Sequence, residues 1–230
     1  MDRIDLGINL SSVRERIAAA CRESGRGVDE VKLIAVSKTH SSAVVREAMR
    51  AGISVFGENR VQEAEGKIAE LGREGLEWHL IGHLQSNKTR RAVQLFDVIH
   101  SVDSEELAER LERICLQEAR ERLDVLIQVD LAGERSKSGI KVSGLRPLIE
   151  RLAGFERLRL KGLMVLPPFF DDPEATRPYF RRLCELRDEL LPGGELSMGM
   201  SHDLCVAIEE GATMVRVGTA IFGERDAVPA

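Results

Sequence analysis

The residue with the clearest chemical potential is Lys38, which follows an apolar, partly β-branched run at residues 33–36. A deprotonated lysine amine attacks carbonyl groups, and desolvation together with nearby cations lowers lysine pKa values. Taken alone, Lys38 is most simply a side chain that buries its stem and extends its ammonium into water. The position of Lys38 in the fold therefore distinguishes a surface lysine from a nucleophile.

Arg216 is a second cation in an unusual place, because it lies inside the apolar run 214–217. It is two residues before Gly218 and so shares a strand face with it. If that face is buried, the guanidinium needs a partner or a ligand, since an unpaired buried charge is very costly. If the face meets helices, the side chain could reach solvent along them. We favour the buried, functional interpretation.

Hydroxyl groups and glycines cluster in two late segments of the chain. Ser201 follows Gly199 and stands at the predicted start of a helix over residues 202–211, and Thr219 follows Gly218. Backbone amides and hydroxyls of this kind bind phosphate groups, although glycines alone are equally typical of ordinary tight turns. The segments therefore indicate a candidate phosphate site.

These residues have to be positioned by regular elements, and the chain alternates throughout between apolar runs and segments with helical spacing. Helical spacing is clear over residues 41–52, 103–123 and 178–191. The apolar runs predict eight strands, at residues 32–37, 54–58, 77–82, 97–102, 124–130, 158–166, 195–198 and 213–218.

Strict alternation of strands and helices predicts a parallel sheet and an α/β fold. Eight units in 230 residues fit a (β/α)8 TIM-type barrel, with an extra helix over residues 8–24 before the first strand. An open doubly wound sheet is the alternative, but no topological switch is evident and closure removes the edge strands. We therefore expect one barrel domain over residues 1–230.

The unusual side chains fall where such barrels place their chemistry, which is the loops after the carboxyl ends of the strands. A residue with reactive or polar character follows five of the eight predicted strands or lies close to their ends. Together they define candidate site residues Lys38, Asn59, His83, Ser201, Arg216, Gly218 and Thr219.

Composition excludes several classes of protein. A net charge of −5 argues against nucleic-acid binding, and we see no run long enough for a membrane span or a signal peptide. The four cysteines form no C-x-x-C pair, which is typical of a reduced, cytoplasmic protein.

Two patterns that look chemical fail on geometry. His79 and His83 lie in a predicted strand, where four residues span about 13 Å, so one metal ion could not bind both. The triad residue types at 201–203 are adjacent and cannot form a hydrolase relay. We therefore expect no metal site and no hydrolase.

Seven motifs occur in order at or just after strand ends, and together they closely resemble the pyridoxal-phosphate homeostasis protein family. They span about residues 33–223 and read VSKTH, FGENRVQE, WHLIGHLQSNK, KSGI, KGLMVLP, LSMGMSHD and VRVGTAIFG. The resemblance implies the fold of the alanine racemase N-terminal domain and pyridoxal 5′-phosphate as the cofactor.

The resemblance also implies roles for single residues. Lys38 matches the lysine that holds the cofactor as an aldimine, and Arg216 matches the arginine near the pyridine nitrogen. Such an arginine would keep that nitrogen unprotonated, which disfavours carbanion chemistry. Asn59 and His83 match residues beside the cofactor, and the phosphate cradle corresponds to Ser201, Gly218 and Thr219.

Three functions remain to be compared. The first is a non-catalytic protein that holds and delivers the cofactor, the second a racemase-like enzyme, and the third a metal- or sugar-phosphate-handling barrel. The third leaves Lys38 unexplained. A racemase of this fold needs a tyrosine from a second domain, whereas this sequence ends at Ala230 and its only tyrosine, Tyr179, lies on a predicted helix. We therefore expect a monomeric carrier that makes transient contact with apo pyridoxal-phosphate enzymes.

Overall fold

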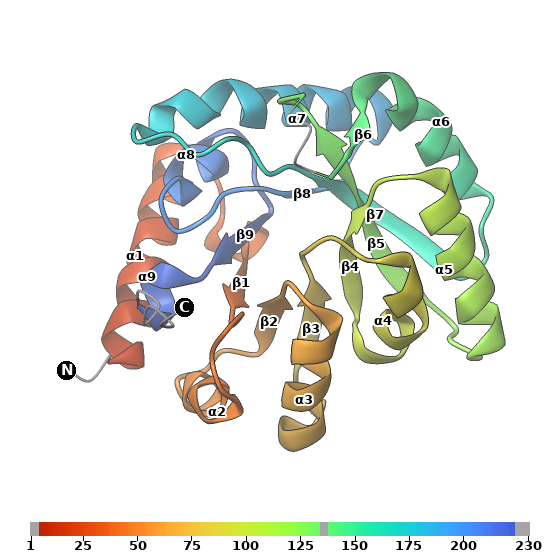
Figure 1. Ribbon diagram of the computed structural model, residues 1–230. Helices are drawn as coiled ribbons and strands as arrows, with labels where there is room; N and C mark the ends of the chain where they lie inside the picture. Colours follow the sequence, from red (N-terminus) through yellow and green to blue (C-terminus); the bar gives the residue numbers. More distant parts are fainter. Residues whose placement is uncertain (1–4, 134–137, 224–230) are drawn as a thin grey trace.

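The eight predicted apolar runs form eight parallel strands that pair in a closed ring. In the computed structural model, which describes residues 5–133 and 138–223, each strand pairs with the next one and the last pairs with the first. The barrel predicted from the sequence is thereby confirmed (Figure 1). Its strands are β1 (Lys32–Val36), β2 (Val55–Glu58), β3 (Glu77–Leu80), β4 (Val98–Val102), β5 (Leu123–Asp130), β7 (Leu158–Met164), β8 (Glu195–Ser197) and β9 (Met214–Val217).

Helices occupy the intervals between these strands and surround the barrel. They are α1 (Leu6–Glu23), α2 (Ser42–Arg50), α3 (Val61–Leu71), α4 (Thr89–Leu95), α5 (Glu105–Gln117), α6 (Val142–Ala153), α7 (Arg177–Leu190), α8 (Leu204–Glu209) and α9 (Thr219–Phe222). Short 3₁₀ turns lie at η1 (Val28–Glu30), η2 (Ser86–Lys88) and η3 (Pro173–Thr176).

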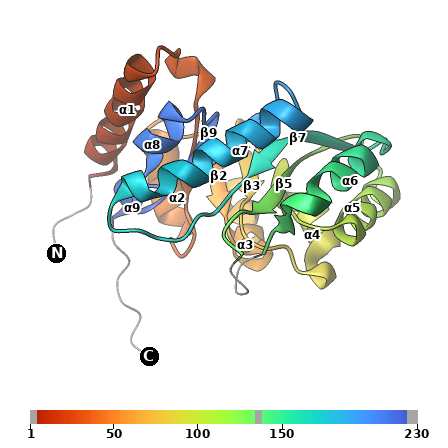
Figure 2. The ribbon, with the colours of Figure 1, turned by 90° about the horizontal axis from the view of Figure 1, so that it is seen from above.

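Local sequence explains several helix ends. Ser104 caps α5, because its Oγ accepts a hydrogen bond from the Leu107 amide. Gly52 follows the end of α2 with a φ of 89°, a left-handed conformation that glycine adopts readily. The extra helix α1 was predicted, and it lies beside α8 and α9 at the seam where β9 meets β1 (Figures 1 and 2).

One short strand was not predicted. β6 (Ile140–Lys141) pairs with the end of β5 and lies outside the ring. Two residues carry too little periodicity to be recognised in a sequence. The KSGI motif begins at Lys137, which lies outside the described residues, so only its later part is seen next to β6.

The barrel wall separates two hydrophobic layers. The larger layer lies between strands and helices and includes the stacked rings of Phe56 and Trp78. A smaller cluster fills the barrel interior, with Ile34, Leu126 and Met164 among its members. The interior is therefore only partly apolar, and polar side chains occupy the rest of it.

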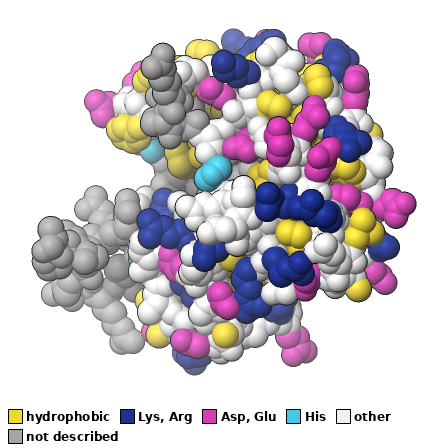
Figure 3. Space-filling model, turned by 45° about the vertical axis from the view of Figure 1, so that its right-hand side comes forward, with side chains coloured by type: hydrophobic (Ala, Val, Ile, Leu, Met, Phe, Trp, Pro, Cys, Tyr) yellow, Lys and Arg dark blue, Asp and Glu magenta, His cyan; other side chains and the backbone are white. Residues whose placement is uncertain are grey.

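The outer surface mixes charges of both signs. Figure 3 brings forward the side that carries α5 and α6, where acidic and basic side chains are interspersed with scattered hydrophobic ones. Several of them are paired, as in Arg151 with Glu109. Among the described helices, none is long and apolar enough to cross a membrane.

Candidate functional site

The alternation of side chains along a strand explains how the candidate residues reach one place. On β9, Met214 packs in the barrel interior, and Arg216 and then Gly218 follow on the same face. On β1, Ile34 has the interior position, and Val36 and then Lys38 continue that series toward the carboxyl end. The interior face of each strand thus leads directly to the mouth of the barrel.

A cavity of about 650 Å³ opens at this mouth. Its size is ordinary for a site that takes a small molecule. All seven candidate residues line it, although they come from five different strand ends. The wall is completed by residues that the sequence alone did not single out, namely Val36, Ile81, Gly82, Gln128, Ser138, Leu166, Phe169, Met200 and His202.

Arg216 faces the barrel interior, which answers the question left open by its position in the sequence. Only 3% of the residue is exposed. Its Nη1 donates to Ser197 Oγ at 2.6 Å, and its Nη2 donates to the Val165 carbonyl at 2.9 Å. Burial lowers the pKa of Arg216 to about 10, so the guanidinium still carries its charge near neutrality.

The backbone on both sides of Lys38 is held by an ionic cluster, which we define as Glu58, Glu63 and Lys67; Glu58 and Lys67 are buried, and the Glu63 side chain is 25% exposed. The Lys67 ammonium donates to the Ser37 carbonyl, to Glu58 Oε1 and to Glu63 Oε1, each at 2.7 Å. The Ser37 hydroxyl donates to Glu58 Oε1 at 2.6 Å.

Thr39, on the other side of Lys38, is held in a strained conformation. Its φ is 69°, which is uncommon for a β-branched residue, and its amide donates to Glu63 Oε1. Glu58 is fully buried, and burial raises the pKa of its carboxyl although the Lys67 ammonium opposes the shift. The cluster therefore fixes the direction in which residue 38 leaves the strand.

The candidate phosphate cradle is a convergence of amides and hydroxyls. The amides of Gly218 and Ala220 donate to Ser201 Oγ at 3.3 and 3.2 Å. Arg16 on α1 donates to the Ser201 carbonyl at 2.9 Å and anchors the turn. Ser201 precedes α8 by three residues, so the expectation that it begins this helix is wrong, because the Met200 amide bonds to Asp203 and forms a turn first.

Asn59 and His83 line the cavity from the ends of the neighbouring strands β2 and β3. A Cβ atom at Gly82 would lie 2.3 Å from the Asn59 carbonyl oxygen, so only glycine permits this close approach between two strand ends. The His83 Nδ1 atom lies 2.9 Å from Ser138 Oγ and 3.7 Å from Asp103 Oδ2. Burial raises the pKa of Asp103, while the His83 side chain is half exposed.

His79 does not share a site with His83. Its ring is fully buried in the barrel and contacts Glu77 and His100. Within residues 5–133 and 138–223, no group of three or more histidine, cysteine, aspartate or glutamate side chains could hold a metal ion. His79 therefore belongs to the barrel interior.

The supporting residues were missed in the sequence. His100 and Ser197 were seen only as parts of strands, Glu58 only as part of a motif, and Lys67 was not singled out at all. The available signal was a polar side chain at an interior position of an apolar run, which needs a partner or a ligand when buried. Partners could not be assigned without the register of the barrel.

The family model for the alanine racemase N-terminal domain matches residues 8–226. Pyridoxal phosphate homeostasis proteins of Aquifex aeolicus and Pseudomonas aeruginosa are 46% and 47% identical, over 94% and 95% of this chain and 96% and 95% of theirs. The solved structure of PipY from Synechococcus elongatus with PLP bound is 42% identical with a TM-score of 0.83, over 95% of this chain and 100% of that chain.

Proposed function

The chain belongs to the pyridoxal phosphate homeostasis protein family, which carries the alanine racemase N-terminal fold, and from this premise we propose that it binds pyridoxal 5′-phosphate. In this proposal Lys38 holds the cofactor as a Schiff base in a single barrel domain. The protein stores and delivers the cofactor within the cell and has no turnover of its own. PLP binding by the similar PipY and the printed names of the relatives support this function.

One observation carries the proposal. A primary amine, a guanidinium and a set of hydroxyls and amides line the same cavity at the barrel mouth. Pyridoxal phosphate supplies an aldehyde that condenses with amines, a pyridine nitrogen and a phosphate dianion. Lys38, Arg216 and the cradle around Ser201 match these three groups in kind, so the donor set fits the cofactor.

The residues of the chain divide the work of binding. The Gly218 and Ala220 amides, with the hydroxyls of Ser201 and Thr219, would bind the phosphate without a cluster of basic side chains. Arg216, buried and charged, would donate a hydrogen bond to the ring nitrogen and keep it unprotonated. Asn59 and His83 would border the ring from the ends of β2 and β3.

A racemase-like enzyme is the alternative function. Racemization by this chemistry requires a second acid/base group on the other face of the cofactor. Tyr179 lies on α7, where its ring packs near Phe170 with centroids 6.0 Å apart, and it is not among the described residues that line the cavity. This arrangement supports a carrier.

Borohydride reduction followed by peptide mapping tests the proposal. The label should be on Lys38, and Lys38→Ala and Lys38→Arg should both abolish it; the second variant keeps the charge but cannot form a Schiff base. A label on another lysine would contradict the site. The loaded protein should convert L-alanine to D-alanine no faster than free cofactor does, and faster conversion would favour the racemase.

Three further parts of the proposal concern the cell. We propose that the protein is a monomer, and that it lies in the cytoplasm, since its four cysteines are free in the described structure and form no C-x-x-C pair. We also propose that it gives up its cofactor during transient contact with apo pyridoxal-phosphate enzymes. Light scattering of the loaded protein measures the first property, and activation of an apo-enzyme faster than by free cofactor measures the second.

A further inference from the structure

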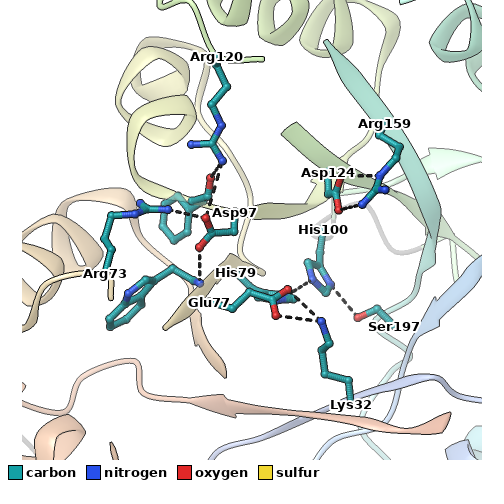
Figure 4. Close-up of polar contacts among 12 residues, drawn as sticks. Lys32, Arg73, Glu77, His79, Asp97, His100, Arg120, Asp124, Arg159 and Ser197 are labelled. Carbon is teal, nitrogen blue, oxygen red and sulfur yellow. Dashed lines mark hydrogen bonds and ion pairs between the residues drawn. The ribbon is translucent and has the colours of Figure 1, made fainter. Parts of the chain in front are cut away.

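A row of polar side chains crosses the barrel interior below the cavity (Figure 4). Ser197 Oγ, which accepts from Arg216, lies 2.8 Å from His100 Nδ1. His100 Nε2 lies 2.7 Å from His79 Nδ1, and His79 Nε2 lies 2.9 Å from Glu77 Oε1. The five residues come from four strands of the ring: Arg216 is on β9, Ser197 on β8, His100 on β4, and both His79 and Glu77 on β3.

The row connects the two ends of the barrel. Ser197, His100 and His79 are fully buried, whereas the Glu77 side chain is 33% exposed at the start of β3. There Glu77 receives the Lys32 ammonium, whose Nζ lies 3.0 Å from each carboxylate oxygen. Arg216 lines the cavity at the other end.

One arrangement of hydrogens satisfies the entire row. Arg216 can only donate, so Ser197 Oγ accepts from it and is left with one hydrogen to give. Ser197 gives that hydrogen to His100 Nδ1. His100 then carries its own proton on Nε2 and donates it to His79 Nδ1.

His79 in turn carries its proton on Nε2 and donates to the Glu77 carboxylate, which only accepts when ionised. Both rings are neutral in this arrangement, and every donor points from the cavity toward the far end of the barrel. The reverse direction would require a charged histidine and would leave the Ser197 hydroxyl hydrogen without a place in the row.

The electrostatic environment agrees with this arrangement. Burial lowers the pKa of both His79 and His100, which keeps the rings neutral. The hydrogen bond from His79 and the Lys32 ammonium lower the pKa of Glu77 to about 2, although burial opposes the shift. The row thus begins at a guanidinium cation, ends at a carboxylate anion and contains only neutral groups between them.

We infer that Glu77, His79, His100 and Ser197 are positioning residues, which orient the Arg216 guanidinium in the cavity through this one-directional chain of hydrogen bonds. The inference rests on the proposed function for its meaning, because Arg216 is the group proposed to face the pyridine nitrogen. Chains of hydrogen bonds polarise one another, so a Ser197 hydroxyl that donates away becomes a better acceptor for Arg216. The state of the cofactor ring would then depend on residues at the opposite end of the barrel.

The first part of the test needs no cofactor. Long-range ¹H–¹⁵N spectra of the apo-protein, labelled at its five histidines, report which ring nitrogen carries the proton. His79 and His100 should both be neutral with the proton on Nε2. A proton on Nδ1 of His100, or a charged His79 ring at neutral pH, would overturn the inference whether or not the protein binds cofactor.

The second part measures the cofactor. His100→Leu removes both hydrogen bonds of the ring, and His100→Gln keeps one donor and one acceptor. We expect about a fivefold to tenfold rise in Kd for pyridoxal 5′-phosphate and a shifted absorption band in His100→Leu, with less than about a twofold change in His100→Gln. Circular dichroism shows that each variant is folded before it is compared.

A distant pair of variants separates the chain from general electrostatics. Glu77→Gln neutralises the carboxylate that ends the chain, and Asp124→Asn neutralises one that pairs with Arg159 at the start of β5, outside the chain (Figure 4). Glu77→Gln should change the NMR signal of the His79 Nε2 proton and the pH dependence of the cofactor's absorption band. Asp124→Asn should leave both unchanged.

The outcomes separate the two claims. If the wild-type protein binds cofactor at Lys38 but His100→Leu has the same Kd and spectrum, the positioning role is overturned and the proposed function stands. If the wild-type protein takes up no cofactor, the proposed function fails and the positioning role falls with it. Recovery in His100→Gln, combined with the expected tautomers, supports the inference.

Discussion

The two candidate cations of the barrel mouth, Lys38 and Arg216, are supported in opposite ways. The backbone around Lys38 is held from outside the barrel wall by the ionic cluster of Glu58, Glu63 and Lys67, between the strands and α3. Arg216 is held from inside the barrel by neutral groups, Ser197 and the two histidines behind it. The first support uses ions and the second avoids them.

The difference matches what the proposed function would require of each cation. A lysine that attacks an aldehyde must lose its proton, and the carboxylates beside it are occupied with Lys67, Ser37 and Thr39. Arginine keeps its proton, so it can be desolvated and held by hydroxyl and carbonyl oxygens. In both cases the supporting groups orient the cation's side chain or backbone, and they do not themselves neutralise the charge of Lys38 or Arg216.

The largest effect should come from breaking the ionic support. Lys67→Met leaves the fully buried Glu58 carboxylate without its cation, which should lower the free energy of unfolding by about 3–5 kcal/mol. Urea denaturation of the apo-protein measures this. The double variant Lys67→Met/Glu58→Gln should recover part of the loss, and a single variant that loses less than about 1 kcal/mol would contradict a charged cluster.

Breaking the neutral support should cost less. Ser197→Ala removes the acceptor of Arg216 Nη1 and the partner of His100 Nδ1, while the Val165 carbonyl still binds the guanidinium. We expect a loss of about 1–3 kcal/mol in the free energy of unfolding. A loss as large as that of Lys67→Met would show that the two supports do not differ in kind.

Acid should also distinguish the two supports. His79 and His100 have lowered pKa values in the fold, so below about pH 6.5 the unfolded chain binds protons that the folded one refuses. Each histidine therefore contributes stability above that pH, and this is lost by about 1.4 kcal/mol per unit as the pH falls toward the folded value.

Glu58 has the opposite sign, because its folded pKa is raised: its contribution is present below about pH 4.5 and lost as the pH rises through the folded value. Urea titrations from about pH 7.5 to 5 give the free energy of unfolding at each pH. Its slope against pH should be shallower in His100→Gln than in the wild type by the contribution of one histidine. Equal slopes would mean that His100 titrates normally in the fold.

The smallest effect concerns the strained residue next to Lys38. Thr39→Gly relieves a left-handed conformation and should raise the free energy of unfolding by about 0.5–1 kcal/mol. Ala119→Gly is the matched control, since Ala119 has a φ of 52° at the end of α5, away from the cavity. Only Thr39→Gly should slow Schiff-base formation, followed by absorbance after mixing with cofactor; equal rates would remove the functional role of the strain.

The barrel and the members of its site could be predicted because both depend on local information. Eight apolar runs define eight strands, and the residue after each strand end must reach the mouth. The supports depend on the register between strands far apart in sequence. His100 and Ser197 are 97 residues apart and meet only because the ring closes with its particular stagger.

The ionic support was hidden for a different reason. Glu63 and Lys67 have the i,i+4 spacing of an ordinary exposed helix pair, and only the packing of α3 on the strands buries Lys67. The two-residue β6 and the turn before α8 were missed because individual hydrogen bonds determine such short elements. The periodicity of the sequence does not reveal these hydrogen bonds.

The most direct test of the account is a crystal structure of the protein grown with pyridoxal 5′-phosphate. We expect continuous density between Lys38 Nζ and the cofactor, the ring nitrogen beside Arg216, and the phosphate next to Ser201 and Thr219. Cofactor bound to any other lysine, or a ring turned away from Arg216, would contradict it.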